Sequence, residues 1–180
     1  SKDEYYADAQ NREEVEGENL DHKTESDSSA KVFFTNSGRK VFAGGGITPD
    51  YIVKNEKLTD YSTNLLKNNV FYEFVLKYLD VNKKNIQSEF NGDLKKFNST
   101  FQFNETEINN FIKFSENKNV KFSSEDFSID KGYILTRLKA EIARNFWKNE
   151  GWYSIMIKND DQVSKALTLF TEAKSIANLK

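Results

Sequence analysis

The chain has 180 residues, with 26 Lys and Arg against 28 Asp and Glu, one His, no Cys and a net charge of -2. This length suits one domain, or a small domain with an arm, and the composition excludes disulfides, cysteine nucleophiles, thiolate metal sites and multi-histidine metal centres. The near-neutral charge and the lack of an apolar run of about 18 residues lead us to expect no cofactor, no nucleic-acid partner and no membrane span.

Residues 1–30 form an acidic segment with ten acidic and three basic side chains. The stretch from Glu13 to Ser29 has almost nothing to bury, so we expect 1–30 to be a mobile insert. Tyr5 and Tyr6 are interpreted as solvated loop residues, with anchoring of the start of the segment as the alternative. His22, between Asp21 and Lys23, is interpreted as a solvated imidazole.

Residues 31–57 are predicted to form a β ribbon. The β-prone run Lys31–Thr35 is followed by the turn signal Asn36–Gly38 and by a returning run, Arg39–Phe42. A third β-prone run covers Tyr51–Val53.

Three consecutive glycines, Gly44–Gly46, follow the returning run. A phosphate-binding loop needs a helix N-terminus directly after its glycines, whereas Pro49 biases Thr48 toward extended geometry. We therefore interpret the glycines as conformational, allowing positive φ or close backbone approach, and not as a nucleotide site.

The apolar period changes to 3.6 residues beyond residue 58, which predicts a helical domain over 58–180. A first helix is capped by Ser62 or Thr63 and buries Leu65, Leu66, Phe71, Phe74, Val75, Tyr78 and Leu79. A short helix from Asn82 to Phe90 ends near Asn91-Gly92. Asn104 with Glu107 matches the spacing of a capping box for a third helix, which buries Ile108, Phe111, Ile112 and Phe114. We expect the side chains of three residues in the linking segment to pack into the core: Phe97, Phe101 and Phe103.

Two further helices are predicted toward the C-terminus. One covers about 130–148, with Ile134, Leu135, Leu138, Ile142 and Phe146 inward. The other is capped by Asp160 or Asp161, a pair interpreted as caps and not as metal ligands. Its core-facing stripe is Val163, Ala166, Leu167, Phe170, Ala173 and Ile176. Gly151–Ile157 is left open as a strand, a helical turn or a docking surface, and Trp147 and Trp152 are candidate interface aromatics.

Several of these segments resemble the carboxy-terminal processing (tail-specific) serine proteases. The ribbon is similar to the family's Thr-x-x-Gly-Arg-x-Val-x-Gly-Gly-Gly-Gly-Ile-x-Pro-Asp segment through Thr35, Gly38, Arg39, Val41, Gly44–Gly46, Ile47, Pro49 and Asp50, and departs from it at Ala43. The residues Tyr5, Tyr6, Asp8 and Arg12 resemble the start of the acidic insert in the long forms typical of Bacteroidetes-like bacteria. Leu138–Trp147 and Asp161–Leu167 are similar to the helical end of those proteins.

The resemblance implies that this chain is the C-terminal part of an exported endopeptidase that cleaves proteins near their C-terminal tails. The family's nucleophilic Ser, its Lys base and an inserted PDZ module all precede the glycine segment. No catalytic, cofactor-binding or metal-binding residue is therefore expected within 1–180. The implied partners are the protease core and PDZ module of the same polypeptide and protein or peptide substrates, and the implied location is the cell envelope, in the periplasm.

The expected fold is mainly α (α+β), with a bundle of about five helices preceded by a short β ribbon at the edge of the protease core. The expected divisions are 1–30, 31–57 and 58–180. The alternative hypothesis is a free-standing helical protein-binding module without enzymatic activity.

Overall fold

The computed structural model describes residues 32–35, 38, 40–42, 51, 53 and 57–176. The chain divides into two compact units, Ser1–Asn55 and Glu56–Lys180. The expectations for the acidic segment 1–30, for Gly44–Gly46 and for Pro49 fall outside the described residues.

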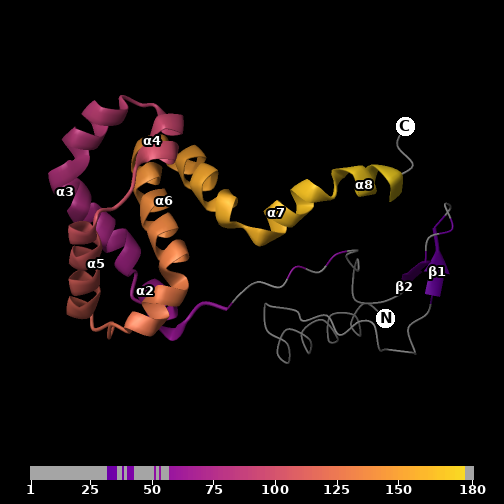
Figure 1. Cartoon of the computed structure of the whole chain (residues 1–180), viewed down its shortest axis with the longest axis horizontal. Coiled ribbons are helices and arrows are strands. Elements are labelled where there is room, and N and C mark those ends of the chain that lie inside the picture. The colour runs from indigo at the N-terminus through magenta and orange to yellow at the C-terminus, as the bar shows by residue number, and fades with distance from the viewer. Residues whose placement is uncertain are drawn as a thin grey trace, which may run out of the picture. The chain divides into compact units, whose positions relative to one another are not determined.

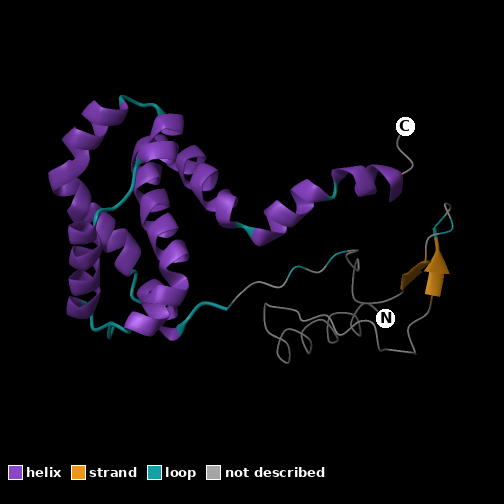
Figure 2. Cartoon of the chain, viewed as in Figure 1, coloured by secondary structure: helices purple, strands orange, loops and turns teal. Residues whose placement is uncertain are grey.

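The first unit contains the predicted ribbon. Strand β1, Val32–Phe34, pairs antiparallel with β2, Lys40–Phe42, and Phe33 lies opposite Val41 (Figure 2). At the turn between them Gly38 has a φ of 80° and donates its N–H to the Thr35 carbonyl at 2.8 Å. Positive φ is the geometry that glycine accepts at low cost, so the turn signal predicted this feature for the correct reason.

The third β-prone run is not a strand at the two of its positions that are described. Tyr51 lies in a bend and Val53 lies in no regular element. A β-prone run becomes a strand only when a neighbouring strand pairs with its backbone groups, and the described part of the ribbon pairs only β1 with β2.

The second unit is helical, which confirms the mainly α prediction (Figure 1). Residues 57–176 contain no strand. The helices are α2 Asp60–Lys67, α3 Val70–Phe90, α4 Leu94–Thr100, α5 Glu105–Asn117, α6 Ser124–Met156, the 3₁₀ turn η1 Ile157–Asn159, α7 Asp161–Thr168 and α8 Phe170–Ile176. They outnumber the expected five or so because the first and the last predicted helix are each two helices, and because α4 has no periodic pattern that predicts it.

The first predicted helix is two helices. Thr59, and not Ser62 or Thr63, caps α2 by accepting the Ser62 N–H. Asn69 then adopts a left-handed conformation with a φ of 55°, which separates α2 from α3. Asparagine is one of the few non-glycine residues that adopt this geometry readily.

Helix α3 also absorbs the predicted short helix, because it runs without interruption to Phe90. It ends as predicted, with left-handed Asn91 and Gly92. The capping box of α5 is confirmed as well. The Asn104 side chain accepts the Glu107 N–H at 3.0 Å, and the Glu107 carboxylate accepts the Asn104 N–H at 2.9 Å.

The core of the second unit is rich in aromatic rings that α3, α4, α5 and α6 bring together. The most deeply buried large side chains are Phe97, Phe111, Leu65, Ile134, Leu138 and Ile142. Phe101 and Phe103 pack against this core as predicted. Each such side chain contributes about 1.5–3 kcal/mol by burial, so these contacts hold the helices together.

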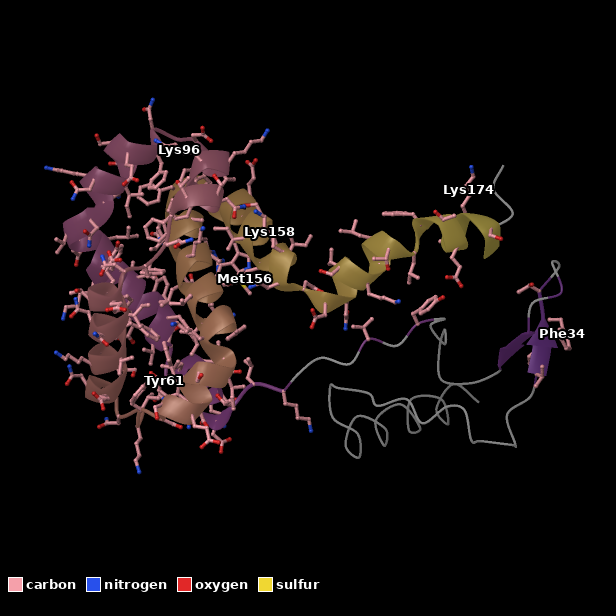
Figure 3. All side chains as sticks on the ribbon, viewed as in Figure 1. Phe34, Tyr61, Lys96, Met156, Lys158 and Lys174 are labelled. Carbon is pink, nitrogen blue, oxygen red and sulfur yellow. The ribbon has the colours of Figure 1, made fainter. Side chains whose placement is uncertain are left out.

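Two carboxylates of α6 hold the start of α2. Asp130 accepts the Thr59 N–H at 2.9 Å and the Thr59 hydroxyl at 2.6 Å. Asp126 accepts the Tyr61 N–H at 3.2 Å. Tyr61 lies inside the bundle, where its hydroxyl and that of Ser115 share a hydrogen bond (Figure 3). These carboxylates satisfy N–H groups that the start of a helix leaves without intrahelical partners.

We expect Asp130→Asn to lower the free energy of unfolding at pH 7 by about 1–3 kcal/mol. Burial opposes ionisation of Asp130, but the nearby Ser62 hydroxyl and the two hydrogen bonds from Thr59 outweigh it, so the pKa is lowered. A lowered pKa stabilises the fold above the unfolded-state value, about 4, and this stabilisation is lost as the pH falls through the folded-state value.

Urea unfolding of both proteins at neutral pH and at a series of acidic pH values measures this effect. The difference between them should shrink as the pH falls, and a difference that does not depend on pH would contradict the assignment. Asp80→Asn, at an exposed position of α3, is the matched control and should leave the unfolding free energy unchanged.

Helix α6 reverses at Lys148, which has the non-helical angles φ 56° and ψ -138°. The segment beyond it returns along the first part of α6, so that Gly151 lies against Ala143 and the Asn159 amide donates to the Thr136 hydroxyl at 2.6 Å. The predicted helix therefore ends close to residue 148. The region left open, Gly151–Ile157, is helical up to Met156.

The predicted core stripe of the last helix is not buried. Asp160 caps α7 as expected by accepting the Val163 N–H at 3.0 Å. No residue of α7 is buried, and Leu167 and Phe170 are 62% and 69% exposed. Ala166 and Ala173 are exposed, Val163 is half-buried, and the side chain of Ile176 is not described. The amphipathic pattern is present, but the described residues place nothing over it.

Candidate functional site

The described residues contain no group of three or more His, Asp and Glu side chains that could hold a metal ion. None of the helices in the same part of the chain is long and apolar enough to cross a membrane. His22 lies outside the described residues.

Trp147, a candidate interface aromatic, has a role within the bundle. Its indole N–H donates to the Gly92 carbonyl at 2.8 Å, and its ring lies 5.2 Å from that of Phe97. It therefore ties the turn between α3 and α4 to α6.

Trp152, the second candidate, lies within cation–π distance of two arginines. The guanidinium of Arg137 is 5.0 Å from the ring centre and that of Arg144 is 5.5 Å from it. Glu141 is buried beside them, 3.9 Å from Arg137. Burial raises the pKa of Glu141, and the two arginines only partly offset the increase. Since the cations face a ring and a carboxylate of the same chain, this cluster holds the returned segment against α6.

Lys139 is a described lysine with a lowered pKa, a property that would suggest a general base. Burial is the main cause of the lowered pKa, and the positive charge of Lys158 lowers it further. Its ammonium group already donates to the carbonyls of Asn98 and Phe101, at 2.9 and 2.8 Å. Lys139 therefore satisfies carbonyls at the end of α4, and these contacts give it a structural role.

The strongest candidate site is a groove beside α3, which we call the α3 groove. It is open to solvent, and its volume is about 270 Å³. One wall is the face of α3 that carries Tyr78, Asn82, Asn85 and Glu89. These positions recur at spacings of three and four, so the helix turns all four side chains to the same side.

The opposite wall is the linker between α4 and α5, which runs beside α3 (Figure 1). It contributes Phe101, Gln102 and Asn104, together with Glu107 from the first turn of α5. Most of the groove surface is polar, and buried Ile86 and Phe90 lie beneath it.

Tyr78 joins the two walls. Its hydroxyl donates to the Glu107 carboxylate at 2.7 Å. Burial, this hydrogen bond and the negative charges of Glu107 and Glu89 all raise the pKa of Tyr78, so the phenol stays protonated at neutral pH. The negative charges of Glu107 and Glu89 therefore both reach the Tyr78 hydroxyl, and they make the groove electronegative.

Sequence reasoning missed the α3 groove. Asn82, Asn85 and Glu89 follow the helical period, which is a signal that the sequence contains. Polar residues on a helix usually face solvent, however, and nothing local indicates that the linker lies opposite them.

Residues 61–148 match a family of unknown function (DUF8443). The match covers most of the helical bundle and ends at the reversal of α6. No curated protein matches the chain, and no solved structure matches it.

Proposed function

We propose that this chain is the C-terminal, non-catalytic part of an exported serine endopeptidase of the carboxy-terminal processing class. The observation that carries the proposal is the ordered pattern from Thr35 to Asp50, in which Gly38, Arg39 and Gly44–Gly46 occupy the positions of the family segment. The ribbon that the first half of this pattern predicts is present as β1 and β2.

The helical resemblance supports the proposal in two ways. In Leu138–Trp147 the matching residues include buried Leu138, Ala140, Ile142 and Ala143, so similarity there follows from packing. In Asp161–Leu167 the matching residues include exposed Leu167. Together with exposed Phe170, Leu167 leaves an apolar stripe uncovered among the described residues, which favours contact with a further part of the protein, and in the proposed enzyme this part is the protease core.

The intact enzyme would hydrolyse peptide bonds near unstructured C-terminal tails in the cell envelope, with a Ser nucleophile and a Lys general base upstream of residue 1. Residues 31–57 would brace the catalytic core, and the helical unit would serve as scaffold. A free-standing helical binding module is the alternative, which the closed core of residues 57–156 favours.

The coding sequence upstream of Ser1 separates the two hypotheses. We expect it to encode a Ser in a short turn followed by a Lys base. The longer protein should cleave an unstructured peptide and be labelled by a fluorophosphonate probe, and both activities should be lost when that Ser is changed to Ala.

The isolated chain is the control for this experiment and should be neither labelled nor active. Stoichiometric labelling of a Ser within 1–180 would overturn the assignment of the chain as non-catalytic. A start codon directly before Ser1 would favour the binding module instead.

A further inference from the structure

We propose that the α3 groove binds a segment of extended polypeptide that carries a basic side chain. This inference deepens the proposed function, and rests on it only for the source of the polypeptide, the unstructured tail of a substrate. The groove would hold such a tail outside the protease core.

The linker offers backbone groups for pairing. Phe101 and Asn104 have extended geometry, with φ/ψ of -67°/127° and -81°/169°. Among the described residues, the backbone N–H and C=O groups of Gln102 and Phe103 make no hydrogen bond. Backbone groups of successive extended residues point to opposite edges, so a peptide that lies in the groove can pair with the groups of one of these two residues.

The linker is held rigidly from its inner side. Lys139 binds the Phe101 carbonyl at 2.8 Å, and the rings of Phe101 and Phe103 pack together with their centres 5.1 Å apart. The capping box fixes Asn104 at the other end. Since the linker is already ordered, a peptide would bind without the entropic cost of ordering it.

The charge of the groove favours a basic side chain. Among the described residues no side chain binds the Glu89 carboxylate, and Glu107 accepts only from Tyr78 and from Asn104. Lys96, the nearby cation, donates to the Glu89 backbone carbonyl at 2.8 Å and does not line the groove. A Lys or Arg of the bound peptide would therefore meet two carboxylates without a competing cation among the residues that line the groove.

The size and the polar lining fit a peptide better than an enclosed small molecule. The volume of about 270 Å³ lies below the about 300–1,000 Å³ of small-molecule pockets, and the groove is open. It accommodates one side chain with its adjoining backbone. Asn82, Asn85 and Gln102 provide amide donors and acceptors that match peptide groups. A saccharide also suits amide side chains, but it uses neither the extended backbone nor the two carboxylates.

The test is a titration of the isolated chain with a short, unstructured, lysine-rich peptide, followed by fluorescence anisotropy and by amide NMR shifts. We expect saturable binding, with shifts confined to residues 78–107, and weaker binding of the same peptide with Glu in place of Lys. Glu89→Lys should weaken binding about fivefold or more, since one exposed charge pair is worth up to about 1 kcal/mol and the reversal adds repulsion.

The matched control is Asp80→Lys. Asp80 is also an exposed carboxylate of α3, but it lies nine positions before Glu89 and therefore on the opposite side of the helix. It should leave the affinity unchanged. The inference is overturned by the absence of saturable binding at millimolar peptide, by equal effects of the two variants, or by shifts in 78–107 that a soluble oligosaccharide causes and the peptide does not.

This experiment and that of the proposed function fail separately. If the upstream sequence encodes the Ser and Lys but the chain does not bind peptide, only the groove inference falls. If the chain binds peptide but no protease core precedes it, the proposed function falls and the groove remains a peptide-binding site.

Discussion

Phe97→Ala is expected to lower the free energy of unfolding of the isolated chain by about 3–5 kcal/mol. Phe97 is completely buried. Its ring is stacked on that of Phe101, with the ring centres 4.7 Å apart. Its centre lies 5.1 Å from that of Phe90, in a T-shaped arrangement, and 5.2 Å from that of Trp147. Removing the ring would leave a cavity where α3, α4 and α6 meet, because three rigid rings cannot close around the space.

Urea unfolding followed by circular dichroism measures this loss. Phe170→Ala is the matched control, because Phe170 in α8 is 69% exposed, and it should change the unfolding free energy by less than about 0.5 kcal/mol. A loss below about 1 kcal/mol for Phe97→Ala, or equal losses for the two variants, would contradict the core described here.

Gly151→Ala is expected to destabilise the chain by about 1–3 kcal/mol, although it adds only a methyl group. A Cβ at position 151 would lie 2.5 Å from the Ala143 carbonyl oxygen and 3.0 Å from the Trp147 Cβ. The nearest atoms belong to the backbone of α6, so the returned segment would have to move away from it. Trp152, which lies on that segment within cation–π distance of Arg137 and Arg144, should report the movement through its fluorescence.

Gly132→Ala in the same helix is the control, and it is expected to raise the free energy of unfolding where Gly151→Ala lowers it. No heavy atom lies within 4 Å of a Cβ added there, and the position is exposed. Alanine should therefore stabilise the helix by about 0.5–1 kcal/mol. Denaturation of both variants tests the pair, and a stabilising effect of Gly151→Ala would show that the segment beyond Lys148 does not pack on α6.

The predictions that succeeded depend on residues within one helical turn of each other. The capping box of Asn104 and Glu107, the cap at Asp160 and the end of α3 at Asn91-Gly92 all follow from side chains that satisfy nearby backbone groups. Helix α4 was not predicted because its seven residues bury a single side chain, Phe97. A single buried residue cannot produce the repeating apolar pattern that indicates a helix.

The predictions that failed depend on contacts between distant residues. The start of α2 is at Thr59 because Asp130, far along the chain, binds its N–H and hydroxyl. The sharp reversal at Lys148 has no glycine or proline to indicate it, and it becomes possible because Gly151 fits against Ala143. Neither contact is visible in the local pattern.

By itself the sequence determined the helical class, the ribbon turn at Gly38 and the helix ends at Asn91-Gly92, Asn104 and Asp160, since these follow from backbone geometry and short-range hydrogen bonds. Only the tertiary structure decided which apolar stripes are buried. The stripe of α3 and the stripe containing Leu167 and Phe170 have the same period, but burial requires a second surface, and the described helices supply one only for α3. The α3 groove likewise exists because packing brings the Gln102 linker opposite Glu89, two segments that no local pattern relates.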